Sequence, residues 1–397
     1  MSVRPLRGAI RPYAWGSRSV LAELQGRPVP SDGPEAELWL GAHPGDPSIV
    51  DDKDGPIGLD ALITADPPGV LGAEVAGEFG PRLPYLLKVL AADSPLSLQA
   101  HPDAEHARAA YAAQQADPDA PRNYTDEFHK PEMLVALTPF AALCGFRSPE
   151  VSAAVLADLR LPELDPVIAQ LRTGVAGLRG AVRSLLTWPQ EKRSQLIEAV
   201  VRAAGEQPTT HPYADDRTLA LELAAHYPGD PGVLVALLLN HVRLAPGEAI
   251  WMPAGNLHAY LSGAGVEIMA ASDNVLRGGL TPKRVDVDEL LRVLRFEVLD
   301  EVILPPAEVA PGVVTWPVPA REFALHRVVL DDAVPEVRLP VRGPRVVLAV
   351  RGEITVVPGG SGDPVTVTAG SAAFAAAGAG EVSVSGSGVV FVASVAG

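Results

Sequence analysis

The stretch 247–260 constrains the fold of this chain more than any other. It predicts a strand over 248–252, a tight turn over 253–255, and a second strand that begins near His258. The turn contains a proline, which fixes φ, and a glycine, which tolerates positive φ, so its geometry is rigid. A rigid turn between two strands holds one imidazole at a fixed point, as a metal site requires. One histidine cannot hold a metal ion, so further ligands must come from elsewhere in the chain.

Charge and composition exclude several classes of protein. The formal net charge of −16 argues against a nucleic-acid partner, because binding to nucleic acid needs a basic surface. No apolar run is long enough to span a membrane, and the N-terminus lacks the apolar stretch of a signal peptide. The single cysteine, Cys144, excludes an internal disulfide and fits a reducing compartment. We therefore expect a cytoplasmic protein, a monomer in the simplest case, with neither a nucleic acid nor a membrane as its partner.

The spacing of apolar residues changes twice along the 397 residues, a length that favours more than one domain. Residues 1–147 read mainly as short strands, whereas apolar residues over 148–240 recur at helical spacing. The strand pattern returns over 241–299 and continues over 300–397 with turns at regular intervals. The sequence thus predicts a mainly β protein in which an α-helical insertion interrupts the first β domain and a second β domain follows.

Four polar side chains on three expected strands could meet at one metal ion. Gln99 and His101 are two residues apart in an alternating strand, so both side chains share one face. Glu132 lies on a second strand, and His258 lies on a third. Two imidazoles, a carboxylate and an amide oxygen favour Zn²⁺, with iron, manganese or cobalt also conceivable. The alternatives are that Gln99 is only a polar strand residue and that Glu132 only pairs with Lys130.

Several motifs resemble known protein families. Gly247, Pro253, Gly255 and His258 are similar to the second sequence motif of the cupin superfamily, whose fold is a β-barrel of jelly-roll type. Longer blocks resemble the type I mannose-6-phosphate isomerase (phosphomannose isomerase) family, and they lie at 13–17, 86–90, 97–103, 129–132 and 267–283. The resemblance covers about residues 1–300 in order.

This resemblance implies a cupin jelly-roll catalytic domain and a zinc enzyme that interconverts mannose 6-phosphate and fructose 6-phosphate. It implies one zinc ion per chain, held by the same four residues, and an active-site arginine at Arg277. The last hundred residues resemble the family only in being rich in β-strand. We expect a second, jelly-roll-like domain there that has lost its metal ligands, because His326 is its only histidine.

Exchange between an aldose and a ketose moves a proton between C1 and C2 through an enediol. It needs an acid/base pair near those carbons and a cation beside the developing oxyanion. The candidates for proton transfer are Lys130, Glu267 and Asp273, with His129 as a candidate for ring opening, and the choice among them stays open. Arg277 could bind the phosphate or stabilise the enediolate, and the resemblance favours a place beside the reacting carbons.

The phosphate group of the substrate needs its own ligands. Lys88 is the one charge in its strand and Ser97 lies two residues before Gln99, so we expect both to bind phosphate. Lys283 and Trp15 belong to the resembling blocks and complete the expected substrate-binding set. Lys88 could instead extend to solvent, and a tryptophan such as Trp15 is more often a core residue than a platform for substrate.

Two other functions are compatible with parts of the sequence. A different metal-dependent cupin enzyme, such as a dioxygenase or another sugar isomerase, could use the same scaffold. Gln99 argues against a dioxygenase, because that chemistry usually has more histidine ligands. A non-catalytic bicupin that binds sugar phosphates would tolerate loss of Lys130 and Arg277, yet both are present.

Overall fold

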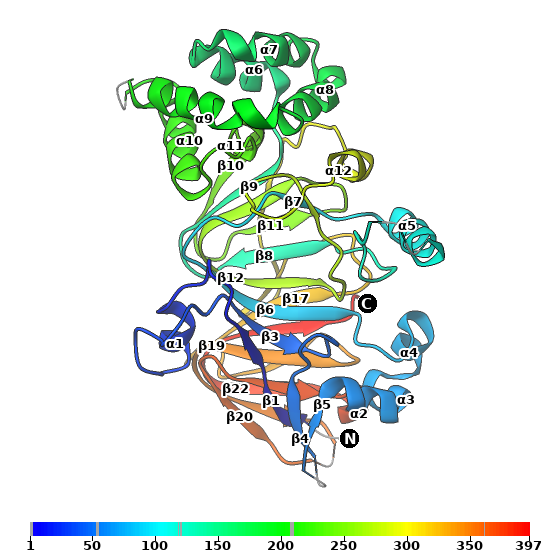
Figure 1. Ribbon diagram of the computed structural model, residues 1–397. Helices are drawn as coiled ribbons and strands as arrows, with labels where there is room; N and C mark the ends of the chain where they lie inside the picture. The colour runs from blue at the N-terminus through cyan, green and yellow to red at the C-terminus, as the bar shows by residue number, and fades with distance from the viewer. Residues whose placement is uncertain (1–2, 53–54, 118, 120, 207–209, 361) are drawn as a thin grey trace.

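Two large antiparallel sheets and a group of helices at one end form the molecule (Figure 1). This computed structural model describes residues 3–52, 55–117, 119, 121–206, 210–360 and 362–397. The expected mainly β fold with an α-helical insertion is confirmed. No helix in these ranges combines the length and the apolar character needed to cross a membrane.

The first sheet is organised around β12 (His258–Ala270), which pairs with β6, β7, β8 and β9. The other strands of this sheet are β2 (Ala9–Arg11), β3 (Glu37–Gly41), β6 (Tyr85–Ala92), β7 (Gln99–Ala100), β8 (Glu132–Ala136), β9 (Phe140–Phe146), β10 (Leu239–Leu244), β11 (Ala249–Met252), β13 (Leu276–Arg277) and β14 (Ile303–Leu304). Strand β6 is buried along its whole length, which explains why its sequence is almost continuously apolar.

The second sheet contains most of the C-terminal strands and three strands from the beginning of the chain. Its strands are β1 (Val3–Arg7), β4 (Ile49–Asp52), β5 (Gly55–Gly58), β15 (Ala307–Ala310), β16 (Val313–Thr315), β17 (Ala324–Leu330), β18 (Glu336–Arg338), β19 (Arg345–Pro358), β20 (Val365–Thr368), β21 (Ala372–Ala375) and β22 (Val382–Ser394). Strand β1 pairs with β21, while β14 pairs with β11 of the first sheet. Each sheet therefore includes strands from both ends of the chain, which the expected bounds 1–147 and 300–397 do not describe.

The helical insertion lies between β9 and β10 and forms the end of the molecule drawn at the top of Figure 1. Its helices are α6 (Pro149–Asp158), α7 (Asp165–Leu171), α8 (Val175–Leu186), α9 (Gln190–Gly205), α10 (Ala214–His226) and α11 (Gly232–Ala236). The hydroxyl of Ser148 accepts a hydrogen bond from the Val151 N–H and caps α6, which begins with a proline. Apolar faces of these helices, such as Leu178 and Leu185 of α8, are fully buried in one core.

The remaining helices lie outside the insertion. They are α1 (Val20–Leu24), α2 (Leu59–Ala65), α3 (Pro67–Leu71), α4 (Ala73–Phe79), α5 (Ala104–Ala116) and α12 (Val287–Val293). A separate core joins the two sheets and includes Tyr85 of β6 and Phe391 of β22. The buried Tyr85 hydroxyl contacts the carbonyls of Pro344 and Ala393, each at 3.1 Å, so the two sheets are joined by hydrogen bonds as well as by apolar packing.

Candidate metal centre and active site

The rigid turn places His258 next to the ligands expected on the other strands. Gly255 has φ of 80°, as the tight turn requires, and its N–H donates to the carbonyl of His101 at 2.8 Å. Glu132, the first residue of β8, lies in register with Met252, the last residue of β11 before the turn. The turn therefore starts beside one expected ligand, is bonded to a second, and ends at the third.

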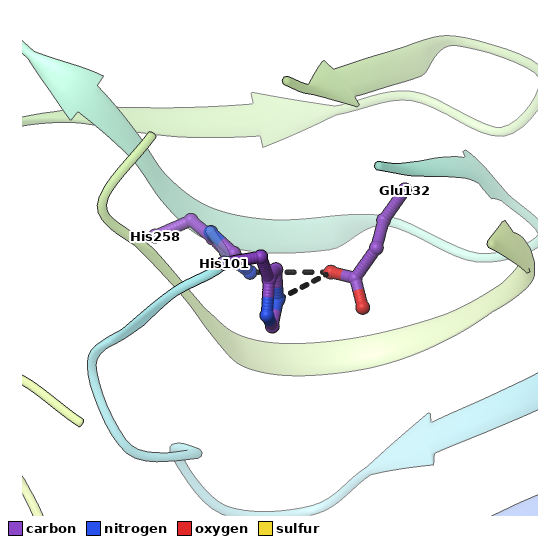
Figure 2. Close-up of side chains that lie close together, drawn as sticks. All are labelled: His101, Glu132 and His258. Atoms are coloured by element: carbon purple, nitrogen blue, oxygen red, sulfur yellow. Dashed lines mark ion pairs between the residues drawn. The ribbon is translucent and has the colours of Figure 1, made fainter. Parts of the chain in front are cut away.

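His101, Glu132 and His258 converge on one point (Figure 2). One carboxylate oxygen of Glu132, Oε2, lies 3.3 Å from Nε2 of His101 and 3.3 Å from Nε2 of His258. All three side chains are almost fully buried, and none of these three atoms has a hydrogen-bond partner among the described residues. Ligand atoms about 2.0–2.1 Å from a tetrahedral Zn²⁺ would lie about 3.3 Å from one another. The three residues fit a bound metal ion in spacing and chemistry.

Both imidazoles are held in the tautomer that a metal requires. Nδ1 of His101 lies 2.7 Å from the carbonyl of Asn274, and Nδ1 of His258 lies 3.0 Å from the carbonyl of Asn256. A carbonyl can only accept, so each Nδ1 carries the proton and each Nε2 presents a lone pair. Burial lowers the pKa of His101 to about 4, which keeps the ring neutral.

Glu132 is ionised and has two different neighbours. Its Oε1 lies 2.7 Å from Nζ of Lys130, while Oε2 faces the two imidazoles. Burial alone would raise the pKa of Glu132, but Lys130 and His101 outweigh it and hold that pKa well below its ordinary value. The pairing of Glu132 with Lys130 therefore exists but leaves the other carboxylate oxygen available to a metal.

Gln99 and Arg277 lie on short strands beside this group. Gln99 is opposite His258 in the β7–β12 pairing and opposite Arg277 in the β7–β13 pairing. The half-buried Arg277 has no side-chain hydrogen bond or ion pair among the described residues, and burial lowers its pKa. Gln99 as a ligand stays a prediction, and Arg277 is a cation free to bind an anion.

A second buried cluster occupies neighbouring strands β3, β6 and β12. Nζ of Lys88 lies 3.1 Å from Glu267 and 3.4 Å from Glu37, and the other oxygen of Glu267 accepts from the Tyr260 hydroxyl at 2.7 Å. Although burial acts in the opposite direction, Glu267 and Glu37 raise the pKa of Lys88. Burial raises the pKa of Glu267 even though Lys88 opposes that effect. Lys88 is thus already surrounded by carboxylates.

The other proposed acid/base residues lie in separate ion pairs. Nε2 of His129 is 2.6 Å from Glu322, a residue of the C-terminal region. Asp273 is 3.3 Å from the buried His43 rather than paired with Arg277, and His43 lowers the pKa of Asp273 although burial opposes this.

The remaining substrate-binding candidates are more scattered. Ser97 is half-buried in the irregular stretch before β7. Trp15 stacks on Tyr13 with ring centroids 5.7 Å apart and packs against the apolar cluster that includes Tyr260. Lys283 is exposed and lines a cavity of about 390 Å³ between the helical insertion and the stretch 279–287. No hydrogen bond or ion pair joins these three side chains to the proposed metal ligands in the part of the chain that the structure describes.

Sequence reasoning missed several residues that contact the predicted set. They are Glu37, His43, Asn256, Tyr260, Asn274 and Glu322. The carboxylate of Glu37 had one available signal, a charged residue two positions before Trp39 in a buried strand. The contacts of Asn274 and Glu322 carried no local signal, because their partners lie far away in the sequence.

Comparison with known proteins identifies the family of this chain. The family model for the catalytic domain of type I phosphomannose isomerase matches residues 3–149. The mannose-6-phosphate isomerase of Escherichia coli strain K12 is 37% identical over 362 residues, which cover 89% of this chain and 90% of that protein. The human mannose-6-phosphate isomerase is 34% identical over 401 residues, covering 94% and 93% of the two chains.

Solved structures of the same family match the whole chain. A crystal structure of a point mutant of phosphomannose isomerase from Salmonella typhimurium has a TM-score of 0.90 at 33% identity and full coverage of both chains. A zinc-bound structure of mannose 6-phosphate isomerase matches with a TM-score of 0.89 at 33% identity, again over both full lengths. The expected cupin jelly-roll fold is consistent with this family. Given this identity over nearly its whole length, the chain belongs to the type I phosphomannose isomerase family.

Proposed function

We propose that this chain interconverts mannose 6-phosphate and fructose 6-phosphate with one zinc ion held by His101, Glu132, His258 and Gln99. The observation that carries this proposal is the convergence of three buried ligand atoms that have no hydrogen-bond partner among the described residues. Relatives named mannose-6-phosphate isomerase and a zinc-bound structure of that enzyme support it. Gln99 as the fourth ligand is supported by its register opposite His258.

The proposed chemistry divides into charge stabilisation and proton transfer. A bound zinc ion acts as a Lewis acid on a substrate oxygen. We assign proton transfer between C1 and C2 to Lys130. Its buried amine lies 2.7 Å from ligand Glu132, which supports a place near a substrate oxygen that the metal would hold. Glu267 is the weaker candidate, because both of its oxygens already bind Lys88 and Tyr260.

Ring opening requires removal of a proton from the anomeric hydroxyl and delivery of a proton to the ring oxygen. His129 and Asp273 are the candidates, and each already has a partner of complementary chemistry, Glu322 and His43. A carboxylate beside an imidazole fixes the tautomer and orientation of the ring, as an acid/base group needs. We propose that His129 or Asp273 performs this step before isomerisation.

We propose that Arg277 binds the substrate anion, because it is half-buried and its guanidinium has no partner among the described residues. This anion is either the developing enediolate or the phosphate, and Ser97 is proposed as a further phosphate contact. Lys88 is less suited to phosphate, since a phosphate there would also approach the carboxylates of Glu37 and Glu267. Lys283 and Trp15 stay predictions as substrate contacts.

A coupled assay on mannose 6-phosphate, with and without a metal chelator, tests the proposed reaction. The activity should disappear with the chelator and return with Zn²⁺. Lys130→Ala should abolish turnover while zinc remains bound, and Lys192→Ala, on the exposed surface of the helical insertion, is the matched control. Near-parent turnover by Lys130→Ala would exclude Lys130 from proton transfer, and no turnover by the parent chain with zinc would refute the proposed reaction.

A further inference from the structure

We propose that Asn274 is a positioning residue that fixes ligand His101 and the chain segment leading to ligand Glu132 in one common arrangement. The proposal deepens the proposed function and rests on it, because a metal ion must occupy the three converging side chains. Asn274 itself touches neither the proposed metal position nor, on this proposal, the substrate. It acts through hydrogen bonds from both its backbone and its side chain.

The side-chain amide of Asn274 is completely buried and uses both of its ends. Its Oδ1 faces the backbone N–H of Thr125 at 2.8 Å, the Thr125 hydroxyl at 3.2 Å and the N–H of Asp126 at 3.4 Å. Its Nδ2 donates to the carbonyls of Asp126 and Phe128, each at 2.8 Å, and to Oδ1 of Asp126 at 3.1 Å. One side chain therefore binds the backbone of three residues within 125–128, namely Thr125, Asp126 and Phe128.

These contacts matter because the 125–128 segment has no sheet or helix partner of its own. It is an irregular stretch that continues directly through Lys130 to Glu132. Backbone N–H and carbonyl groups outside a helix or sheet need other hydrogen-bond partners, and the Asn274 amide supplies them here. The Ser272 hydroxyl adds a bond to Oδ1 of Asp126 at 2.8 Å. The segment that leads to Lys130 and Glu132 is thus held by a buried amide, while Glu132 itself is also held by its strand pairing with Met252 and Met269.

The backbone of the same residue orients another ligand. The carbonyl of Asn274 accepts from Nδ1 of His101 at 2.7 Å, which sets the tautomer and the direction of Nε2. The side chain and the carbonyl of Asn274 therefore couple two of the three converging ligands. Asn274 also lies between Asp273 and Arg277, so movement of this loop would displace both proposed active-site residues.

The chemistry of the position requires an amide. A carboxylate at residue 274 could not donate to the carbonyls of Asp126 and Phe128, and it would place a second negative charge against Asp126. An alanine would remove the partner of the part-buried Thr125 N–H and Asp126 carbonyl, which is costly for each group. The Phe128 carbonyl would keep only the Ser272 hydroxyl. Both changes keep the backbone carbonyl that faces His101, so they test the side chain separately.

Asn256 provides a matched control within the same molecule. Its carbonyl accepts from Nδ1 of ligand His258 at 3.0 Å, as that of Asn274 does for His101. Its side-chain Nδ2 contacts Sγ of Cys144 at 3.3 Å and holds no segment that leads to another ligand. If only the carbonyl mattered, the two asparagines would respond alike to substitution.

The experiment compares Asn274→Ala and Asn274→Asp with Asn256→Ala and Asn256→Asp in the full chain. Zinc affinity is measured by competition with a chelator, and ligand geometry is followed through the absorption spectrum of the Co²⁺-substituted protein. For the Asn274 variants we expect zinc affinity to fall about 10–100-fold, the range for lost partners of metal ligands. We also expect an altered Co²⁺ spectrum and a lower kcat with KM nearly unchanged. For the Asn256 variants we expect changes within about 3-fold, well below that range.

The proposal would be overturned if the Asn274 variants had the same zinc affinity and the same Co²⁺ spectrum as the parent chain. Equal losses in the Asn274 and Asn256 variants would also overturn it. Should the Asn274 variants fail to fold, Asp126→Ala decides, because it loosens the same segment from the side of the half-buried carboxylate. That carboxylate accepts from Asn274 Nδ2, from the Ser272 hydroxyl and from the N–H groups of Phe128 and Asp273. Weakened zinc binding in Asp126→Ala supports the proposal, and unchanged binding refutes it. Zinc binding is measured without substrate, so these results stay separate from any failure of the isomerase assay.

Discussion

The two β regions of this protein have interiors of opposite character. The interior of the first sheet holds charged and polar side chains, among them His101, Glu132 and Lys88, all at most 5% exposed. The core of the second sheet is aliphatic and includes Val328, Ile354 and Val392. Strands of similar architecture therefore surround a reactive centre in one region and a conventional hydrophobic core in the other.

The difference suggests that the first sheet carries the reactive groups and that the second sheet contributes mainly to stability. Burying an ionised group is unfavourable unless it is paired, so each buried charge of the first sheet has a partner of opposite charge or a place in the metal centre. The second sheet also buries a charge, Arg345 of β19, but its guanidinium is hydrogen-bonded to backbone carbonyls such as that of Gly380 rather than to a carboxylate. The second sheet contacts the first through a shared apolar core. We infer that the second sheet stabilises a first sheet that is less stable by itself.

The histidines of the two regions show the same contrast. Among the described residues, His101, Glu132 and His258 are the only group of metal-binding type. His326 of β17 is also buried, but its Nδ1 has no hydrogen-bond partner in that part of the chain, and burial lowers its pKa. The expected absence of metal ligands in the C-terminal region stays a prediction.

The largest expected effect comes from removing a metal ligand. His258→Ala should lose zinc and reduce kcat/KM by at least about 10³-fold, the upper range for loss of oxyanion stabilisation. His326→Ala, the buried histidine of the other sheet, should keep zinc content and kcat at parent values. Metal analysis and the coupled assay check both. If both variants lost zinc and activity to the same extent, the proposed difference between the two sheets would be wrong.

The buried cluster of the first sheet should show the next largest effect. Lys88→Met leaves the carboxylates of Glu37 and Glu267 buried without their cation, so we expect a loss of about 3–5 kcal/mol in the free energy of unfolding. The exposed pair Arg7–Asp51, which joins β1 and β4 of the second sheet, is the control. Arg7→Met should cost less than about 1 kcal/mol. Urea unfolding measures both, and a small effect of Lys88→Met would show that the cluster is not a coupled charge network.

A cavity in the second sheet should affect stability without affecting chemistry. Ile354 of β19 is fully buried among aliphatic side chains, so Ile354→Ala should cost about 2–4 kcal/mol of unfolding free energy. The kcat of the folded protein should not change, because no residue of that core contacts the proposed active site. Urea unfolding and the coupled assay, corrected for folded fraction, check this. A fall in kcat at full folding would show that the second core also shapes the active site.

The smallest expected effect concerns the ion pair between the regions, Glu322–His129. Glu322 has a folded pKa below its ordinary value, because His129 outweighs the effect of burial. Its contribution to stability is therefore present above the ordinary glutamate pKa of about 4.3 and is lost as the pH falls through the lower folded value. Glu322→Gln should lower the free energy of unfolding by about 1 kcal/mol at pH 7. The free energy of unfolding of this variant should also decrease less than that of the parent as the pH falls.

Arg321→Ala is the matched control for that variant. Arg321 belongs to the same loop and pairs with Glu78, but its side chain is 79% exposed, so we expect at most about 0.5 kcal/mol. Thermal unfolding between pH 7 and pH 3 compares the two variants. If the stability of Glu322→Gln falls with pH in parallel with that of the parent, this ion pair does not contribute to the loss of stability in acid.

The sequence by itself determined the local features of this protein. The proline and glycine of 253–255 predicted a rigid turn, and the structure has the positive φ of Gly255. The change of period located the helical insertion. The shared face of Gln99 and His101 stays a prediction, because the expected alternating strand is a strand only over Gln99–Ala100. These features follow from steric limits and periodicity within a few residues, so no distant contact is needed to find them.

Only the tertiary structure decided which distant groups meet. Strand parity gives the face of Lys88 but not its neighbours, and the fold places it between Glu37 and Glu267. Binding of phosphate by Lys88 stays a prediction. The partners of His129 and Asn274 come from segments separated by more than a hundred residues. Pairing between such segments depends on how two sheets close around a common core, and local propensity does not encode that.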